Sequence, residues 1–565
     1  MSEVHVRATD GPAKIWLASY PPNVPADIPP LKHRSLGELF EDSCSLYADR
    51  PAFSSMGKTL TFAQIDAESR KVAAWLQDQG FGKGDRIAVM LPNILQNPVI
   101  VYGILRAGMV VVNVNPLYTV RELEYQLKDA GAQAIFVLEN FAHTVSKAIP
   151  KTAVSHVVVA TMGDMLGLKG HIVNFVVRKV KKLVPRYSLP SARAFKDVLQ
   201  KGEGLTLTPV AVSAHDVAFL QYTGGTTGVS KGAILTHANL LANKEQMGLW
   251  LESAFLTKRR PPQLQFLCAL PLYHIFALTV NSLMGVATGS HNVLIANPRD
   301  IPALVKEIHQ HRIHIFPGLN TLFNALMNNA EFEKLDFSSL LLVFGGGMSV
   351  QRPVAERWYK MTGCPITEGY GLSETSPVAT ANRCDSSEFS GMIGLPVSST
   401  EISIRDDNGK DVELGGVGEI CIRGPQVMAG YWNRSDETAR AMTPDGFFRT
   451  GDMGYMDARG YTKIVDRKKD MIIVSGFNVY PNEIEEVAAM HPGIAECAAI
   501  GVADEHSGEA VKLFIVRKDA AITEADVKAH CAANLTNYKR PRFIEFREQL
   551  PKSNVGKILR RELRG

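Results

Sequence analysis

This sequence of 565 residues lacks paired cysteines, unbroken apolar runs and a large excess of one charge. The seven cysteines are scattered and none forms a Cys-x-x-Cys pair, which argues against a disulfide framework or structural zinc and fits a reducing cytoplasm. No apolar segment typical of a signal peptide follows Met1. The longest apolar stretch, residues 98–116, is broken by Arg106 and two asparagines, so it does not suit a bilayer span. We therefore expect a cytoplasmic location.

The overall composition is that of an ordinary folded protein. Hydrophobic residues make up 45% of the chain and charged residues 21%, which argues against disorder. The formal net charge is only +4, so no basic field for nucleic acid is indicated and we expect no nucleic-acid partner. Because a single hydrophobic core stops growing well below this length, the chain should form at least two domains.

Strand and helix patterns alternate along most of the chain. Residues 86–91, 110–114 and 134–138 are short apolar runs typical of buried strands, and helical patterns separate them. The same rhythm returns over residues 291–345. This alternation predicts an α/β fold in which two doubly wound subdomains each have a mainly parallel sheet covered by helices.

The pattern changes twice near the end. Residues 391–464 form shorter, glycine-richer segments that predict a small antiparallel barrel. After Asp466 a helix follows Pro481, and strands and a second helix come later. We therefore divide the chain into a large N-terminal domain, residues 1–465, and a small α+β C-terminal domain, residues 466–565.

The most informative local feature is the segment Tyr222-Thr-Gly-Gly-Thr-Thr-Gly-Val-Ser-Lys-Gly232. Its glycines let backbone N–H groups turn toward an anion, its hydroxyls add donors, and Lys231 adds a positive charge. It is not a Walker A loop, because two residues separate the last loop glycine from the lysine. The alternative is a flexible polar hairpin. The residues expected at the phosphates are Thr223, Gly224, Gly225, Thr226, Thr227, Gly228 and Lys231.

This loop resembles the phosphate-binding signature of the adenylate-forming superfamily, which includes acyl-CoA synthetases, luciferases and peptide-synthetase adenylation domains. Pro271-Leu-Tyr-His-Ile-Phe276 is similar to the next family motif, whose histidine, here His274, lies near the acyl site. Phe344-Gly-Gly-Gly-Met348 resembles the region that receives adenine. Glu368-Gly-Tyr-Gly-Leu-Ser-Glu-Thr375 resembles the Tyr-Gly-Leu-Thr-Glu motif, with serine in place of threonine.

The resemblance implies roles for these residues toward ATP. Tyr370 would stack on adenine, and Glu374 would hold Mg²⁺ as a hard oxygen ligand. Asp452 would accept hydrogen bonds from both ribose hydroxyls, which a carboxylate can do, and Arg467 would contact the ribose. The remaining residues expected to bind the nucleotide are Gly345, Gly346, Gly347, Gly371 and Ser373.

The last hundred residues carry three further expected sites by resemblance. Asp466 matches the hinge about which the small mobile domain rotates. Gly476 and Phe477 match the segment that forms the passage for the thiol substrate. Lys557 matches the lysine that bridges carboxylate and phosphate during adenylation. The catalytic residues implied are Lys557, Glu374, Lys231 and His274.

The resemblance covers nearly the whole chain and is closest to bacterial long-chain fatty acyl-CoA ligases. It implies that fatty acid, ATP and CoA react with Mg²⁺ to give acyl-CoA, AMP and pyrophosphate through an acyl-adenylate, in fatty acid degradation and lipid metabolism. Phe447 and Arg449 stand where the family signature often has tryptophan and histidine. The acyl pocket cannot be identified from motifs, so the long-chain preference depends on resemblance alone.

Other functions stay open at this point. A fatty acyl-AMP ligase that delivers to a carrier protein would share the loop and the lysine, and a medium-chain, short-chain or aryl acid ligase would differ in the pocket. A luciferase-type oxygenase would also adenylate its substrate. A non-catalytic nucleotide- or lipid-binding protein is disfavoured, because Lys231, Glu374, Asp452 and Lys557 are all present.

Residues 170–185 predict a basic amphipathic helix. Such a helix can lie on an anionic membrane surface, here the cytoplasmic face of the inner membrane. A helix that packs its apolar face on the domain would have the same pattern. The sequence has no clear oligomeric signal, and a homodimer stays open. Ile172, Phe175, Val176, Val180 and Leu183 share the apolar face, and Arg178, Lys181 and Lys182 lie opposite.

Overall fold

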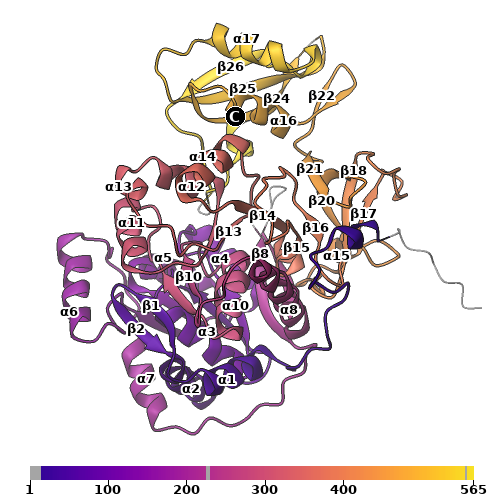
Figure 1. The fold of residues 1–565 in the computed structure, drawn as a ribbon. Helices are drawn as coiled ribbons and strands as arrows, with labels where there is room; N and C mark the ends of the chain where they lie inside the picture. The colour runs from indigo at the N-terminus through magenta and orange to yellow at the C-terminus, as the bar shows by residue number, and fades with distance from the viewer. Residues whose placement is uncertain (1–13, 224–229, 505, 554–555, 565) are drawn as a thin grey trace, which may run out of the picture.

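The computed structural model describes residues 14–223, 230–504, 506–553 and 556–564. Two large mixed sheets form the body of the molecule (Figure 1). The first has eight strands in the order β19-β9-β8-β4-β3-β5-β6-β7, parallel from β8 to β7. Its strands are β3 (Arg86–Met90), β4 (Val110–Asn113), β5 (Ala134–Leu138), β6 (His156–Ala160), β7 (Arg193–Ala194), β8 (Val217–Thr223), β9 (Lys231–Thr236) and β19 (Gly430–Tyr431).

The second sheet has nine strands in the order β16-β15-β14-β13-β12-β10-β11-β1-β2. The central strands from β14 to β1 are parallel, and the strands at both edges are antiparallel. They are β1 (Pro51–Ser55), β2 (Lys58–Thr61), β10 (Gln265–Cys268), β11 (His291–Leu294), β12 (Ile315–Gly318), β13 (Leu342–Gly345), β14 (Ile366–Gly371), β15 (Val378–Ala381) and β16 (Leu395–Pro396).

Helices cover both faces of each sheet, as the alternating pattern predicted. The largest apolar cluster joins the facing sides of the two sheets through α1 to α3 and α8, whereas α4 and α5 cover the outer face of the first sheet and α11 to α14 that of the second. The bounds are α1 (Leu36–Leu46), α2 (Phe62–Asp78), α3 (Gln96–Arg106), α4 (Val120–Ala130), α5 (Ala142–Ala148), α7 (Phe195–Glu203), α8 (His237–Ser253), α9 (Ile275–Ala277), α10 (Met284–Ala287), α11 (Ile301–Gln310), α12 (Asn320–Met327), α13 (Ala330–Glu333) and α14 (Arg352–Thr362).

Threonine starts several of these helices. Thr61, Thr119 and Thr236 each form a capping box at the start of α2, α4 and α8. In each box the threonine hydroxyl accepts from a backbone N–H one turn later, so an otherwise unpaired helix donor is satisfied. These local signals fix where the helices begin, and burial of strands such as β4 and β5 on both faces fixes the sheets.

The glycine-rich region after the second sheet forms a third, antiparallel sheet. Its four strands follow the order β17-β18-β20-β21. The predicted barrel is thus a four-stranded antiparallel layer, to which the chain adds α15 (Ser435–Ala441) between β19 and β20. The strands are β17 (Glu401–Arg405), β18 (Gly418–Arg423), β20 (Phe448–Met456) and β21 (Thr462–Arg467).

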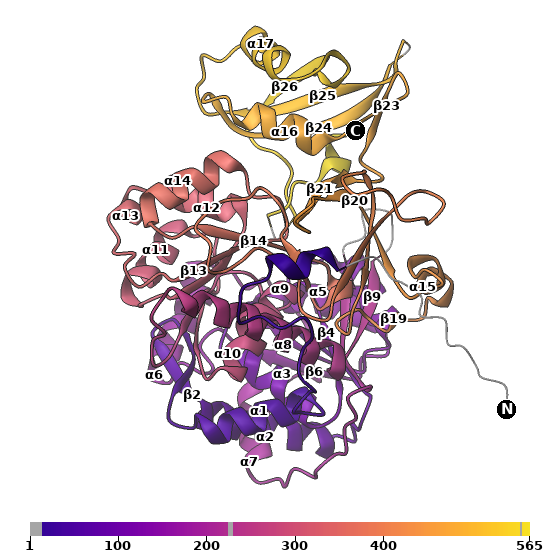
Figure 2. The ribbon, with the colours of Figure 1, turned by 45° about the vertical axis from the view of Figure 1, so that its right-hand side comes forward.

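The remaining chain folds into the small α+β domain, which lies at one end of the molecule (Figures 1 and 2). Five strands pair as β23-β22-β25-β24, with β26 parallel to β25, and two helices pack on them around a separate apolar cluster. The elements are β22 (Ile472–Val474), β23 (Phe477–Val479), α16 (Pro481–Ala489), β24 (Ile494–Asp504), β25 (Gly508–Arg517), α17 (Glu524–Asn534) and β26 (Phe543–Arg547).

Helix α6 (Leu168–Phe175) projects from the flank of the large domain (Figure 1). It continues into a π-helical turn, Val176–Val180, so the predicted amphipathic segment is helical over most of its length. Among the described residues, no helix combines the length and apolarity that crossing a bilayer needs.

Candidate active site

Strands β14, β20 and β21 bring together the residues predicted to hold the nucleoside. Tyr370 near the end of β14 donates its hydroxyl hydrogen bond to the Asp452 carboxylate at 2.6 Å. Arg467, the ladder partner of Asp452 in the β20–β21 pair, places its Nε 3.5 Å from the other carboxylate oxygen. Burial raises the pKa of Asp452, and the Arg467 charge opposes that rise. The carboxylate is therefore held in place by neighbours that leave it able to accept further hydrogen bonds.

The glycines of this region are required by close packing. A Cβ on Gly345 would lie 2.6 Å from the Val350 side chain, and one on Gly371 would overlap the Pro377 carbonyl oxygen. Gly347 has a φ of +75°, and a Cβ there would lie 3.6 Å from Cε of Lys557. The glycine run after β13 therefore serves both as a tight turn and as a surface that another part of the chain approaches closely.

Lys557 enters this site from the C-terminal tail. Its side chain is partly buried, and burial together with the Arg467 charge lowers its pKa to about 8, although Asp452 and Glu374 act in the opposite direction. The tail makes a tight loop in which the Ser553 backbone N–H donates to the Lys557 carbonyl at 2.7 Å. The charges of the predicted adenylation lysine and the predicted ribose carboxylate therefore act on each other.

His274 lies near this lysine, at the start of α9. Its Nδ1 accepts from the Phe276 backbone N–H at 3.4 Å, so the imidazole caps that short helix. Burial and the Lys557 charge lower the pKa of His274 to about 3. The ring is therefore neutral at pH 7 and can act as a hydrogen-bonding group but not as a cation.

Glu374 and Lys231 are linked through a tyrosine that the sequence did not indicate. Tyr431 of β19 donates its hydroxyl hydrogen bond to Glu374 Oε1 at 2.8 Å, and the Lys231 ammonium lies 5.2 Å from the centre of the same ring. Lys231 also forms an ion pair with Glu437 of α15. Burial raises the pKa of Glu374. If a phosphate replaced Glu437 as the partner of Lys231, the Lys231 ammonium would bind it close to the Glu374 carboxylate.

The donor set fits Mg²⁺ bound together with phosphate. Glu374 offers one buried carboxylate, and the described residues include no group of three or more His, Cys, Asp or Glu side chains that could enclose an ion. Mg²⁺ is commonly held by one or two carboxylates with substrate phosphates and water completing its shell. Glu374 is therefore the residue that would bind it here.

The predicted phosphate loop joins two antiparallel strands. Thr223 at the end of β8 pairs with Lys231 at the start of β9. Gly224, Gly225, Thr226, Thr227 and Gly228 lie outside the described residues. The two ends of the loop therefore lie side by side, at Thr223 and Lys231. That the loop binds phosphate stays a prediction.

The predicted hinge residue is buried, whereas the predicted thiol passage is exposed. Asp466 is buried near the end of β21. Ser475 and Gly476 have φ values of +50° and +83° at the tip of the β22–β23 hairpin, the geometry in which two-residue hairpins favour glycine. A Cβ on Gly476 would meet no atom within 4 Å, and Phe477 is 55% exposed and stacked on Tyr538. In this arrangement Lys557 occupies the site and the hairpin tip faces solvent.

Glu368 opens the motif Glu368–Thr375, and the resemblance implies no role for it. Glu368 Oε1 accepts from the Val350 backbone N–H at 3.1 Å, whereas its Oε2 is buried with no hydrogen-bond partner among the described residues. Burial raises its pKa to about 8. No sequence signal pointed to Glu368, because its burial becomes visible only in the folded structure. Tyr431 and Glu437 had no motif to reveal them.

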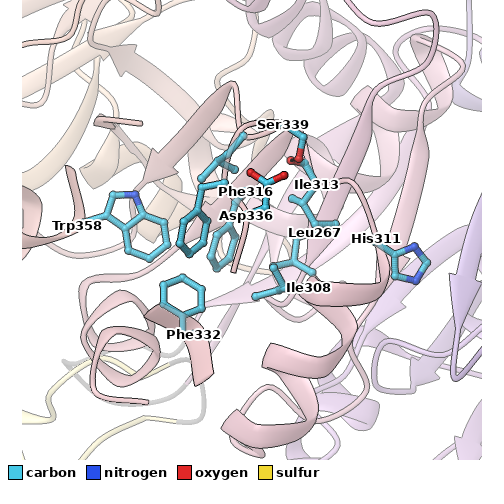
Figure 3. A pocket seen from close by; sticks show the side chains of 11 residues that line it. Leu267, Ile308, His311, Ile313, Phe316, Phe332, Asp336, Ser339 and Trp358 are labelled. Carbon is cyan, nitrogen blue, oxygen red and sulfur yellow. Dashed lines mark hydrogen bonds between the residues drawn. The ribbon is translucent and has the colours of Figure 1, made fainter. Parts of the chain in front are cut away.

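A separate small cavity lies behind the second sheet, between α11, β12 and α14 (Figure 3). The rings of Phe316, Phe332 and Trp358 face it, and His311 lies at its edge (Figure 3). Its volume of about 20 Å³ is room for about one water molecule. This cavity therefore cannot hold an acyl chain.

Comparison with known proteins gives the same picture as the geometry. The profile of the AMP-binding enzyme family matches residues 40–432, and that of the AMP-binding enzyme C-terminal domain matches residues 483–557. A long-chain-fatty-acid–CoA ligase of Yersinia pestis is 56% identical over 98% of both chains, and one of Bacillus subtilis is 39% identical over 97% of both.

Solved structures share the fold over almost the full length. An anthranilate CoA ligase in complex with anthranoyl-AMP matches with a TM-score of 0.83 at 25% identity, covering 95% of this chain and 97% of that chain. ATP-bound MatB from Rhodopseudomonas palustris matches with a TM-score of 0.78 at 28% identity, covering 94% and 98%. The predicted superfamily and its two-domain α/β fold are confirmed, and the chain belongs to the family of AMP-binding enzymes.

Proposed function

We propose that this chain is a long-chain-fatty-acid–CoA ligase that forms an acyl-adenylate from ATP and then the acyl-CoA. The observation that carries the proposal is the convergence of Lys557, Asp452 and Glu374 at one site, from both domains. The names of the full-length relatives support the same reaction and substrate class. A non-catalytic binding protein would have no need of a partly buried lysine near two buried carboxylates.

In the first half-reaction, a carboxylate oxygen of the fatty acid attacks the α-phosphate of ATP, and pyrophosphate leaves. Both the attacking and leaving groups are anionic, so the site must position them and neutralise charge. Lys557 contacts the fatty acid carboxylate and the α-phosphate, and Lys231 exchanges Glu437 for the departing phosphates. Bound at Glu374, Mg²⁺ would neutralise further phosphate charge. Neutral His274 offers a hydrogen bond close to the acyl group.

In the second half-reaction, the CoA thiolate attacks the acyl carbonyl carbon, a thioester forms, and AMP leaves with the bonding electrons. Because Lys557 fills the site in the present arrangement, the small domain must rotate before the thiol arrives. The division at residues 465 and 466 puts the hinge at Asp466, and rotation would bring Gly476 and Phe477 to the passage for CoA.

An acid series tests the proposal. Purified protein with ATP, Mg²⁺ and CoA is given saturated acids from acetate to stearate, and AMP and acyl-CoA are measured. We expect equal amounts of the two products, highest for the long acids. Pyrophosphate release without CoA consumption would instead indicate a carrier-protein acceptor. A maximum with short or aryl acids would contradict the long-chain assignment.

We further propose that the segment including α6 contacts an anionic membrane, where fatty acids partition. The segment packs on the large domain through Gly170, Asn174 and Val177, whereas its apolar stripe faces outward. Arg178, predicted on the basic face, is held by Glu139 at 2.8 Å, so the lysines carry the charge. Exposed apolar side chains beside lysines are what an interfacial helix presents. The outward residues are Leu168 (89% exposed), Ile172 (67%), Phe175 (59%), Val180 (64%) and Leu183 (53%).

Vesicle flotation tests this contact. The double variant Ile172→Ser/Phe175→Ser should lose binding to anionic vesicles but keep activity toward dispersed substrate, because α6 is remote from the nucleotide residues. Leu414→Ser is the matched control, since Leu414 is also exposed (60%) but lies outside this segment. Unchanged binding after Lys181→Glu/Lys182→Glu would contradict the proposed membrane role.

A further inference from the structure

The carboxylate of Asp466 joins the two domains. Its backbone lies at the domain boundary and still pairs with Met453 of the large domain in the β20–β21 ladder. Its side chain is held by the small domain: Oδ2 accepts from the Asn482 backbone N–H at 2.8 Å, and Oδ1 accepts from Arg560 Nη1 at 3.2 Å. The Asp466 carboxylate therefore keeps both contacts only while the two domains hold this relative position.

Arg560 is bound at the same time within the small domain. Its Nε and Nη2 donate to the Glu485 carboxylate at 2.9–3.1 Å, and Nη2 also donates to Asn482 Oδ1 at 2.6 Å. A third carboxylate, that of Asp470, lies 3.7 Å from Nη1. The Arg560 side chain is 15% exposed and the Asp466 side chain is fully buried. Buried charges of this kind depend on their partners, because water cannot replace them.

The position of Arg560 connects this network to catalysis. It lies three residues after Lys557, at the base of the tail loop that carries that lysine. The loop is closed by backbone hydrogen bonds from Ser553 to Lys557 at 2.7 Å and from Leu559 to Pro551 at 2.9 Å. Fixing Arg560 therefore fixes the base from which Lys557 reaches the site.

We propose that Arg560 is a positioning residue for the first half-reaction, because its pairing with Asp466 across the domain boundary stabilises the arrangement that holds Lys557 in the site. The inference rests on the proposed two-step function. Rotation of the small domain about Asp466 moves Arg560 relative to β21, so we expect it to break the Arg560–Asp466 pair. The Arg560–Glu485 pair lies within the small domain and moves with it.

The test measures the two half-reactions separately in the full-length enzyme. Arg560→Gln should slow acyl-adenylate formation about tenfold or more, because the charge-assisted hydrogen bond to Asp466 is lost together with the contacts to Glu485 and Asn482. Thioester formation from supplied acyl-AMP and CoA should stay within about twofold, because that step does not use the Asp466 pair. The matched control is Arg561→Gln, since the neighbouring Arg561 is exposed and lies outside this network.

Further variants separate positioning from simple loss of folding. Arg560→Lys keeps the buried charge with fewer donors and should show a smaller but still selective loss. Asp466→Asn should slow the same step, and combining it with Arg560→Lys should add little, because both remove one interaction. Glu485→Gln weakens a contact of Arg560 within the small domain but keeps the boundary pair, so it should change the ratio of the two rates less than Asp466→Asn does.

Two results would overturn the inference. Equal loss of both half-reactions in Arg560→Lys would mean that Arg560 only maintains the fold of the small domain. Unchanged adenylation would mean that the boundary pair has no effect on Lys557. Failure of the proposed function is distinguishable, since the unmodified enzyme would then form no acyl-adenylate.

Discussion

The pKa of Lys557 leads to a specific pH dependence of adenylation. Lys557 must be protonated to neutralise the reacting anions, and burial with the Arg467 charge lowers its pKa to about 8. The protonated form therefore falls from about nine-tenths of the enzyme at pH 7 to about one-tenth at pH 9, so kcat/KM for ATP should fall about tenfold. A lysine of ordinary pKa, about 10.4, would lose less than about 5% over that range.

The assay is pyrophosphate release without CoA, at subsaturating ATP and constant ionic strength, from pH 7 to 10. Glu368 is the necessary control, because burial raises its pKa to about 8 as well. The alkaline decline should persist in Glu368→Gln. It should disappear in Lys557→Arg, whose guanidinium stays charged, even if the rate is lower. A flat profile to pH 10, or a decline that vanishes in Glu368→Gln, would refute the reasoning.

Three further predictions concern the nucleotide site. Tyr370→Phe keeps the ring but loses the 2.6 Å hydrogen bond to Asp452, so KM for ATP should rise about five- to tenfold with adenylation retained; an unchanged KM would contradict this. Glu374→Gln should raise the Mg²⁺ concentration needed for half-maximal rate at least about tenfold, because a carboxylate is the better ligand. Gly371→Ala places a Cβ against the Pro377 carbonyl oxygen and should lower stability by about 2 kcal/mol or more, measured by denaturant unfolding.

Much of the fold could be predicted because parallel strands that are buried on both faces leave a continuous apolar signature. The run at residues 134–138 became β5 with the same bounds, and the helix predicted after Pro481 became α16. Strand order could not be predicted, because it depends on contacts between distant parts of the chain. Phe53, for example, pairs with Asn292, and nothing in either segment specifies the other.

The site, like the fold, could be predicted only in part. Tyr370 and Asp452 were predicted as neighbours of the nucleoside because each lies in a recognisable motif, and the structure places them in contact. The contact between Tyr431 and Glu374 was missed, because it exists only after β19 pairs with β9 at the sheet edge. The role proposed for Arg560 likewise depends on tertiary contacts, and no motif of the sequence indicates it.

The most direct test of the account is the effect of Lys557→Ala on the two half-reactions. Acyl-adenylate formation from ATP and a long-chain fatty acid should fall at least about a hundredfold, the effect of removing a preorganised group that stabilises charge. Thioester formation from supplied acyl-AMP and CoA should stay within about threefold, because Lys557 has left the site by then. Equal loss of both steps, or adenylation that survives, would contradict the account.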